Sequence, residues 1–135
     1  MKTKIDPKYI GVPNIQFSLT DKNDDREKKF SKQRIKRGFD DSETWSLRDT
    51  IANFIVPRMI RYKEILIETG CRSGYDNEKD SNGDIIDEIK MLEKIIRAFE
   101  LVLRDGGNFI LTKEEEKEYN EGIDLFPEYF LSLWW

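Results

Sequence analysis

The sequence predicts an all-α protein: a bundle of three main helices, preceded by a short basic helix and an extended N-terminal arm. Apolar residues recur at steps of three and four in three separate stretches, which is the spacing of one helix face. Capping patterns and glycines bracket these stretches. The links between them favour antiparallel neighbours, and 135 residues are enough for one domain with its own core.

The N-terminal arm, residues 1–22, is interrupted by Pro7, Gly11 and Pro13. Between these breaks it carries apolar anchors at Ile5, Tyr9, Ile10, Val12, Ile15, Phe17 and Leu19. We expect an extended segment that lies against its own chain or a neighbouring one. Residues 23–135 then form a single helical domain.

A short basic helix is expected over residues 24–37, ended by Gly38. Seven basic residues stand against one acid between Arg26 and Arg37, a local charge of +6. Only Phe30 and Ile35 offer apolar anchors, so this helix is predicted to be peripheral.

The first main helix starts at Ser46 and Asp49, which match a capping box. Its predicted apolar face is Leu47, Ile51, Phe54, Ile55, Met59, Tyr62 and Leu66. Gly70 is placed to end it. Pro57 lacks an amide proton and predicts a kink in the middle.

Two more helices follow a polar loop at residues 70–83. The second main helix has apolar positions at Ile85, Ile86, Ile89, Leu92, Ile95, Ile96, Phe99 and Leu103, and it ends near Gly106. The last helix begins at a second capping box, Thr112 with Glu115. Gly122 and Pro127 both weaken helices and predict a kink or break there.

The composition excludes several kinds of chemistry. The chain has no histidine and one cysteine, so it lacks the commonest general base, an intrachain disulfide and a cysteine-based zinc site. No serine elbow or phosphate-binding glycine loop is present. We therefore expect no enzyme activity, no cofactor and no metal site. The N-terminus lacks a signal-peptide core, and no apolar run is long enough to span a bilayer, so a cytoplasmic protein without a membrane partner is expected.

One loop resembles a calcium site. Residues 78–89 place Asp80, Asn82 and Gly83 at calcium-loop positions. The first ligand position holds Glu78, however, and the last holds Ile89, which removes the bidentate carboxylate. We favour the alternative, a polar turn that precedes a helix.

A candidate ligand site combines cations with aromatics on the first main helix and just before it: Trp45, Arg48, Arg58, Arg61, Tyr62 and Lys63. Arginine beside an aromatic ring can hold a base and a phosphate together, so a nucleotide is a candidate ligand. The alternative is that these residues are the polar flank of a core helix.

The basic helix is a candidate nucleic-acid surface through Lys28, Lys29, Lys32, Lys36, Arg34 and Arg37. The alternative is ion pairing with the acidic segment 114–128, within one subunit or between subunits. That segment has seven acids against one lysine, Lys117.

The C-terminal stretch is unusually aromatic. Phe126, Phe130 and Leu133 share one stripe and need only an ordinary core. A second set lies off that stripe and is a candidate interface: Leu125, Tyr129, Trp134 and Trp135. Either the N-terminal arm or a second subunit covers it, and large apolar patches are rare on monomers, so a homo-oligomer is expected.

Residues 38–64 resemble small, largely uncharacterised proteins encoded by bacteriophages. The shared pattern is Trp-Ser-Leu, then Ile-Ala-x-Phe-Ile-x-Pro-Arg, then Tyr-Lys-Glu, found here at 45–47, 51–58 and 62–64. The stretches 91–102 and 122–135 are similar too, whereas Pro127 and the loop 70–83 depart from the pattern. The resemblance implies a phage origin and assigns no catalytic residue.

Three functional hypotheses follow. The first is a phage accessory protein that counters host defence, either by sequestering a nucleotide signal or by masking a host defence protein. The second is a nucleic-acid accessory protein that uses the basic helix. The third is a structural or assembly protein, for which deletion of Trp134 and Trp135 should dissociate the oligomer.

Overall fold

The computed structural model describes residues 17–69, 88–104 and 109–134, and their regular structure is entirely helical. The helices in chain order are α1 (Glu27–Arg37), the 3₁₀ helix η2 (Asp41–Thr44), α2 (Leu47–Thr69), α3 (Glu88–Leu103), α4 (Lys113–Tyr129) and the 3₁₀ helix η4 (Phe130–Ser132). The predicted all-α class is confirmed, with three main helices after a short basic one. The predictions for the arm before Phe17, for the loop 70–83 and for Trp135 fall outside the described residues.

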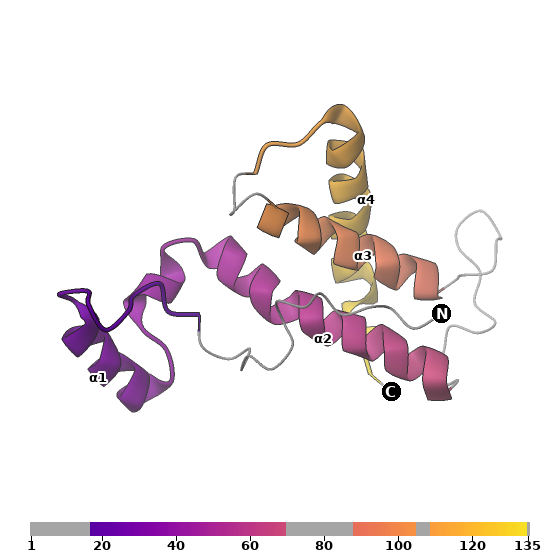
Figure 1. Cartoon of the computed structure of the whole chain (residues 1–135). Coiled ribbons are helices and arrows are strands. Elements are labelled where there is room, and N and C mark those ends of the chain that lie inside the picture. The colour runs from indigo at the N-terminus through magenta and orange to yellow at the C-terminus, as the bar shows by residue number, and fades with distance from the viewer. Residues whose placement is uncertain (1–16, 70–87, 105–108, 135) are drawn as a thin grey trace.

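The core is centred on α3, which packs against both α2 and α4. Its buried side chains include Leu92, Ile95 and Phe99, and α2 contributes Val56 and Leu66. Figure 1 shows α3 running back along α2, while α4 crosses α3. Helix α4 therefore closes one side of the core, and Ile51 and Phe54 of α2 stay partly exposed.

Gly122 marks the place where α4 crosses α3. A Cβ added there would lie 2.1 Å from the carbonyl oxygen of Lys94 and 2.7 Å from Cβ of Ala98. Of the kink or break predicted at Gly122 and Pro127, the break is wrong, because α4 is one helix through both residues to Tyr129. The glycine permits close helix packing, a reason that the local sequence does not reveal. α2 also continues as one helix across Pro57, and the kink predicted there stays a prediction.

The helix ends confirm several predicted signals. Gly38 ends α1 in the left-handed conformation, at φ +86°, and its amide donates to the carbonyl of Arg34. Thr112 caps α4, because its hydroxyl accepts from the amide of Glu115 at 3.2 Å. At the start of α2, the Ser46 hydroxyl donates to the Asp49 carboxylate at 2.7 Å.

α1 and η2 form a small unit of their own at the N-terminal end of α2. Phe30 anchors α1 and is only 4% exposed, but Ile35 is 84% exposed, so the prediction that Ile35 anchors this helix is wrong. Asp40 and Glu43 form a reciprocal capping box around η2. Figure 1 shows α1 lying away from α3 and α4.

Candidate functional site

The six residues of the predicted ligand site do not converge. Arg58 and Tyr62 line one groove, described below. Trp45 packs edge-on against Phe30 at 5.9 Å between ring centroids, and the guanidinium of Arg26 lies 4.7 Å from its ring. These contacts place Trp45 in the α1–η2 unit and away from the groove.

The other three predicted ligand residues are engaged elsewhere. The guanidinium of Arg48 lies 5.3 Å from the ring of Phe109. Arg61 forms ion pairs with Glu64 and Glu68 of its own helix. Lys63 is buried, and its ammonium lies 3.6 Å from the carboxylate of Glu93 on α3. Of the six residues, the structure therefore brings only Arg58 and Tyr62 together in one groove.

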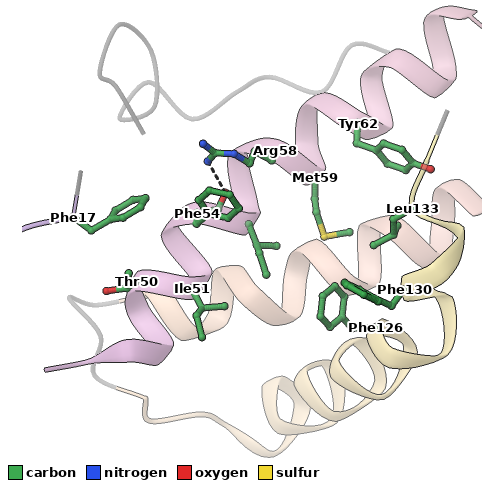
Figure 2. A pocket seen from close by; sticks show the side chains of 11 residues that line it. Phe17, Thr50, Ile51, Phe54, Arg58, Met59, Tyr62, Phe126, Phe130 and Leu133 are labelled. Atoms are coloured by element: carbon green, nitrogen blue, oxygen red, sulfur yellow. Dashed lines mark hydrogen bonds between the residues drawn. The ribbon is translucent and has the colours of Figure 1, made fainter. Parts of the chain in front are cut away.

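A groove of about 580 Å³ lies between α2 and the C-terminal end of α4 (Figure 2). Its lining is apolar except for Thr50, Arg58 and the hydroxyl of Tyr62. The residues are Phe17, Thr50, Ile51, Phe54, Ile55, Arg58, Met59, Tyr62, Phe126, Phe130 and Leu133. The lining residues come from α2, from the end of α4 with η4 and Leu133, and from Phe17.

The groove exists because α2 is apolar on two faces. One face, with Ala52 and Val56, is fully buried in the core. The other carries Ile51 and Phe54, which are 44% and 46% exposed. The periodicity of the sequence placed Ile51 and Phe54 on the core face; that prediction is wrong, because small residues on the opposite side pack into the core instead.

The floor and the rim of the groove differ in burial. Met59, Phe126 and Leu133 pack against the core and form the floor. Ile51, Phe54 and Phe130 form an exposed rim, and Phe130 is 57% exposed although it was predicted to be a core residue. An apolar rim over an apolar floor is typical of a surface that receives another apolar group.

Tyr62 fastens the C-terminal tail over one end of the groove. Its hydroxyl lies 3.0 Å from the carbonyl oxygen of Trp134 and 3.3 Å from that of Ser132. A hydroxyl has one proton, so it serves the two carbonyls in turn. Phe126 adds edge contacts to Phe99 at 5.3 Å and to Phe130 at 5.6 Å between centroids. The tail is thus held as the second wall of the groove.

Arg58 is the only charged residue among the described residues that line the groove. Its guanidinium lies 3.7 Å from the centroid of the Phe54 ring and donates to the carbonyl of Phe54 at 2.9 Å (Figure 2). Stacking on the ring and the hydrogen bond both hold the charge at the rim. A guanidinium held in this way therefore lies at the rim of the groove beside an apolar surface.

The predicted C-terminal interface residues differ in how far they are buried. Leu125 is partly buried and packs against the core. Tyr129 is half-buried, and Trp134 is 62% exposed. The predicted homo-oligomer depends on this exposed surface and stays a prediction.

The basic helix is divided by the structure into two sets. Arg34 forms ion pairs with Glu27 and Asp40, and Arg37 pairs with Asp41. The four lysines at positions 28, 29, 32 and 36 are exposed along one surface.

The acids of α4 that form ion pairs are joined to α3. Glu118 pairs with Arg97, Glu121 with Lys94, and Glu115 with Arg104. Figure 1 shows α1 and α4 far apart. The predicted pairing between the basic helix and the acidic segment is therefore not made within one chain.

Asp40 organises the α1–η2 unit. Its carboxylate accepts from the amide of Ser42 at 2.8 Å and from Arg34. Burial alone would raise the pKa of Asp40, but hydrogen bonds from Ser18, Ser42 and Arg34 outweigh it and lower the pKa to about 2. The Asp-x-x-Glu pattern at residues 40–43 was the available signal for this box, and the sequence reasoning missed it.

The described residues offer neither a metal site nor a membrane-spanning helix. No group of three histidine, cysteine, aspartate or glutamate side chains there is arranged to hold a metal ion. In the same part of the chain, no helix is long and apolar enough to cross a membrane. The calcium-like loop 78–89 lies almost wholly outside the described residues.

The groove, with its rim of Ile51, Phe54 and Phe130, is thus the feature best suited to bind another molecule. Comparison with known proteins found no matching family model, curated protein or solved structure.

Proposed function

We propose that this chain is a non-enzymatic binding protein whose groove receives the apolar face of a helix from a protein partner. The observation that carries the proposal is the apolar lining of a groove of about 580 Å³, with Ile51 and Phe54 half exposed on its rim. Burying such a rim yields roughly 25 cal/mol for each Å² of apolar surface. A helix supplies the complementary row of apolar side chains at i, i+3 or i+4, and i+7.

The positive charge of Arg58 indicates which charged residues the partner helix should carry. A fixed guanidinium at the rim favours a carboxylate beside the apolar row and disfavours a lysine or arginine there. We therefore expect an amphipathic helix with acidic residues along the border of its apolar face.

A nucleotide is the weaker candidate for this groove. Phosphates need several donors, and Arg58 is the one charged residue among the described lining residues. Arg61 and Lys63, predicted to help, pair with carboxylates outside it.

The resemblance to phage-encoded proteins leads us to propose a host protein as the partner. The chain would act in the host cytoplasm by occupying a helix that the host protein needs for its own contacts. This part of the proposal depends on the resemblance alone, whereas the helix-binding groove depends on its geometry.

The direct test uses two matched variants of α2. Ile51 and Ile67 are both 44% exposed and lie on the same helix, but only Ile51 lines the groove. The probe is an amphipathic peptide of about 16 residues with leucines at helical spacing and flanking glutamates. We expect Ile51→Ser to weaken binding by about 10-fold, or about 1.4 kcal/mol, and Ile67→Ser to leave it within about twofold.

Two controls make the result decisive. A peptide with lysines in place of the glutamates should bind more weakly, and Arg58→Glu should reverse that order. Equal losses for both isoleucine variants, or no binding by the native chain, would contradict the proposal. So would a stable dimer in light scattering that Ile51→Ser dissociates, because the groove would then belong to a second copy of the chain.

A further inference from the structure

A second surface lies on α1, at the opposite end of α2 from Thr69. Four exposed lysines line a shallow hollow of about 480 Å³ together with Asp25 and Gln33. We call this set, Lys28, Lys29, Lys32 and Lys36, the lysine stripe. Three of its members are four residues apart, so they follow one another along the helix at about 6 Å.

The ion pairs around α1 are made by arginines and not by the lysine stripe. Arg34 and Arg37 take up the carboxylates of Glu27, Asp40 and Asp41. Arg26 pairs with Asp24. Among the described residues, no ion pair involves a lysine of the stripe, and Asp25 is the one carboxylate in its lining. The ion pairs of this unit thus use its arginines. Arg37 and Gln33, with a smaller effect from Lys29, lower the pKa of Asp41, and all four lysines of the stripe are exposed to solvent.

The body of the protein holds this surface in place. Phe30 is buried on the opposite side of α1, and Gly38 ends the helix with a left-handed turn. Arg34 ties the helix to η2 through Asp40. Because the helix is already anchored, its backbone loses little conformational freedom when the lysine stripe binds a partner, and this favours a stable electrostatic contact.

We propose that the lysine stripe binds the phosphate backbone of double-stranded nucleic acid without sequence preference. Lysine ammonium groups attract phosphates as point charges and carry no base-reading geometry. The described lining has no aromatic side chain on which unpaired bases would stack, which favours a duplex over a single strand. This inference concerns a site separate from the groove and does not depend on the proposed function.

The test measures binding of a labelled random-sequence DNA duplex of about 20 base pairs by fluorescence anisotropy, between about 50 and 200 mM salt. Four neutralised phosphates predict a slope of about −3.6 in a plot of log K against log salt concentration. The variant Lys28→Gln/Lys32→Gln should lower the slope to about −1.8 and weaken binding at low salt by at least 10-fold.

The matched control is Lys113→Gln/Lys117→Gln. These lysines are also exposed and four residues apart, but they lie on α4. The control should bind within about twofold of the native chain, and thermal unfolding should show that both variants remain folded. If the double variant unfolds, Lys32→Gln alone replaces it, with a slope near −2.7 expected.

Four results would overturn the inference: no duplex binding at low salt, a slope near zero, tighter binding of an oligothymidine strand, or equal losses in the stripe and control variants. A dimer that dissociates in Lys28→Gln/Lys32→Gln would overturn it as well. The stripe would then face the unpaired acids of another copy's α4.

Discussion

At the scale of single residues, Asp40 links two helices, although the sequence analysis did not single it out. It is fully buried and joins Arg34 of α1 to Ser42 of η2. Its lowered pKa, about 2 against an ordinary 3.8, means that the charged form is favoured in the folded state. Its contribution is therefore complete above about pH 4 and is lost as the pH falls toward 2.

Asp40→Asn should destabilise the chain by about 2 kcal/mol at pH 7 and by much less near pH 2. The reason is that the native Asp40 side chain is charged at pH 7 and stabilises the fold. Near pH 2 it becomes protonated and loses this contribution, so the native chain and the variant then differ little in stability. Urea unfolding at several pH values measures this difference. Asp124→Asn, on the exposed face of α4, is the control and should stay within about 0.5 kcal/mol. A pH-independent loss for Asp40→Asn would contradict the account.

Gly122 shows how a local signal misleads at this scale. Glycine in a helix predicts weakness, yet here the missing side chain lets α4 reach within contact of the Lys94 carbonyl. The apolar spacing of Tyr119, Ile123 and Phe126 indicates the face that meets the core, but it does not indicate that the backbone of α3 lies close enough there to require a glycine.

Gly122→Ala should destabilise the protein by roughly 1–3 kcal/mol, because the new Cβ would collide with backbone of α3. In an exposed helix the same substitution stabilises by up to about 1 kcal/mol, so the sign of the change is diagnostic. Asn120→Ala, exposed on the same helix, should be neutral or slightly stabilising. Chemical unfolding of both variants measures the difference, and a stabilised Gly122→Ala would refute the close crossing.

At the scale of elements, the sequence predicted which segments are helical better than it predicted their buried faces. Three- and four-residue spacing located α2, α3 and α4, and the Thr112 and Gly38 caps were readable directly. The buried face of α2 could not be predicted in this way, because apolar residues cover more than one side of that helix. Only packing against α3 selects Ala52 and Val56 for the core and leaves Ile51 and Phe54 for the groove.

The α1–η2 unit should unfold separately from the core. Phe30→Ala removes its main buried anchor and should cost that unit about 3–5 kcal/mol. Hydrogen exchange should become faster in α1 and η2, while α3 keeps its protection, because α1 lies away from α3 (Figure 1). Faster exchange throughout α3 would show that the two parts form one cooperative unit.

At the scale of the whole molecule, the groove is a product of tertiary structure. Two of the six predicted ligand residues, Arg58 and Tyr62, line it, whereas its rim of Ile51, Phe54 and Phe130 had been assigned to the core. A sequence can show that apolar residues exceed what one helix face needs. It cannot show that α4 crosses α3 and leaves one side of α2 uncovered.

The central claim, that this groove receives an apolar helix, is tested most directly by locating the bound peptide. The measurement is a methyl NMR titration of isoleucine-labelled protein with the glutamate-flanked amphipathic peptide. The account predicts shifts at Ile51 and Ile55, which line the groove, and none at Ile35 and Ile110, which are exposed elsewhere. Shifts at Ile35 or Ile110 with Ile51 unmoved, or no shifts at saturating peptide, would contradict it.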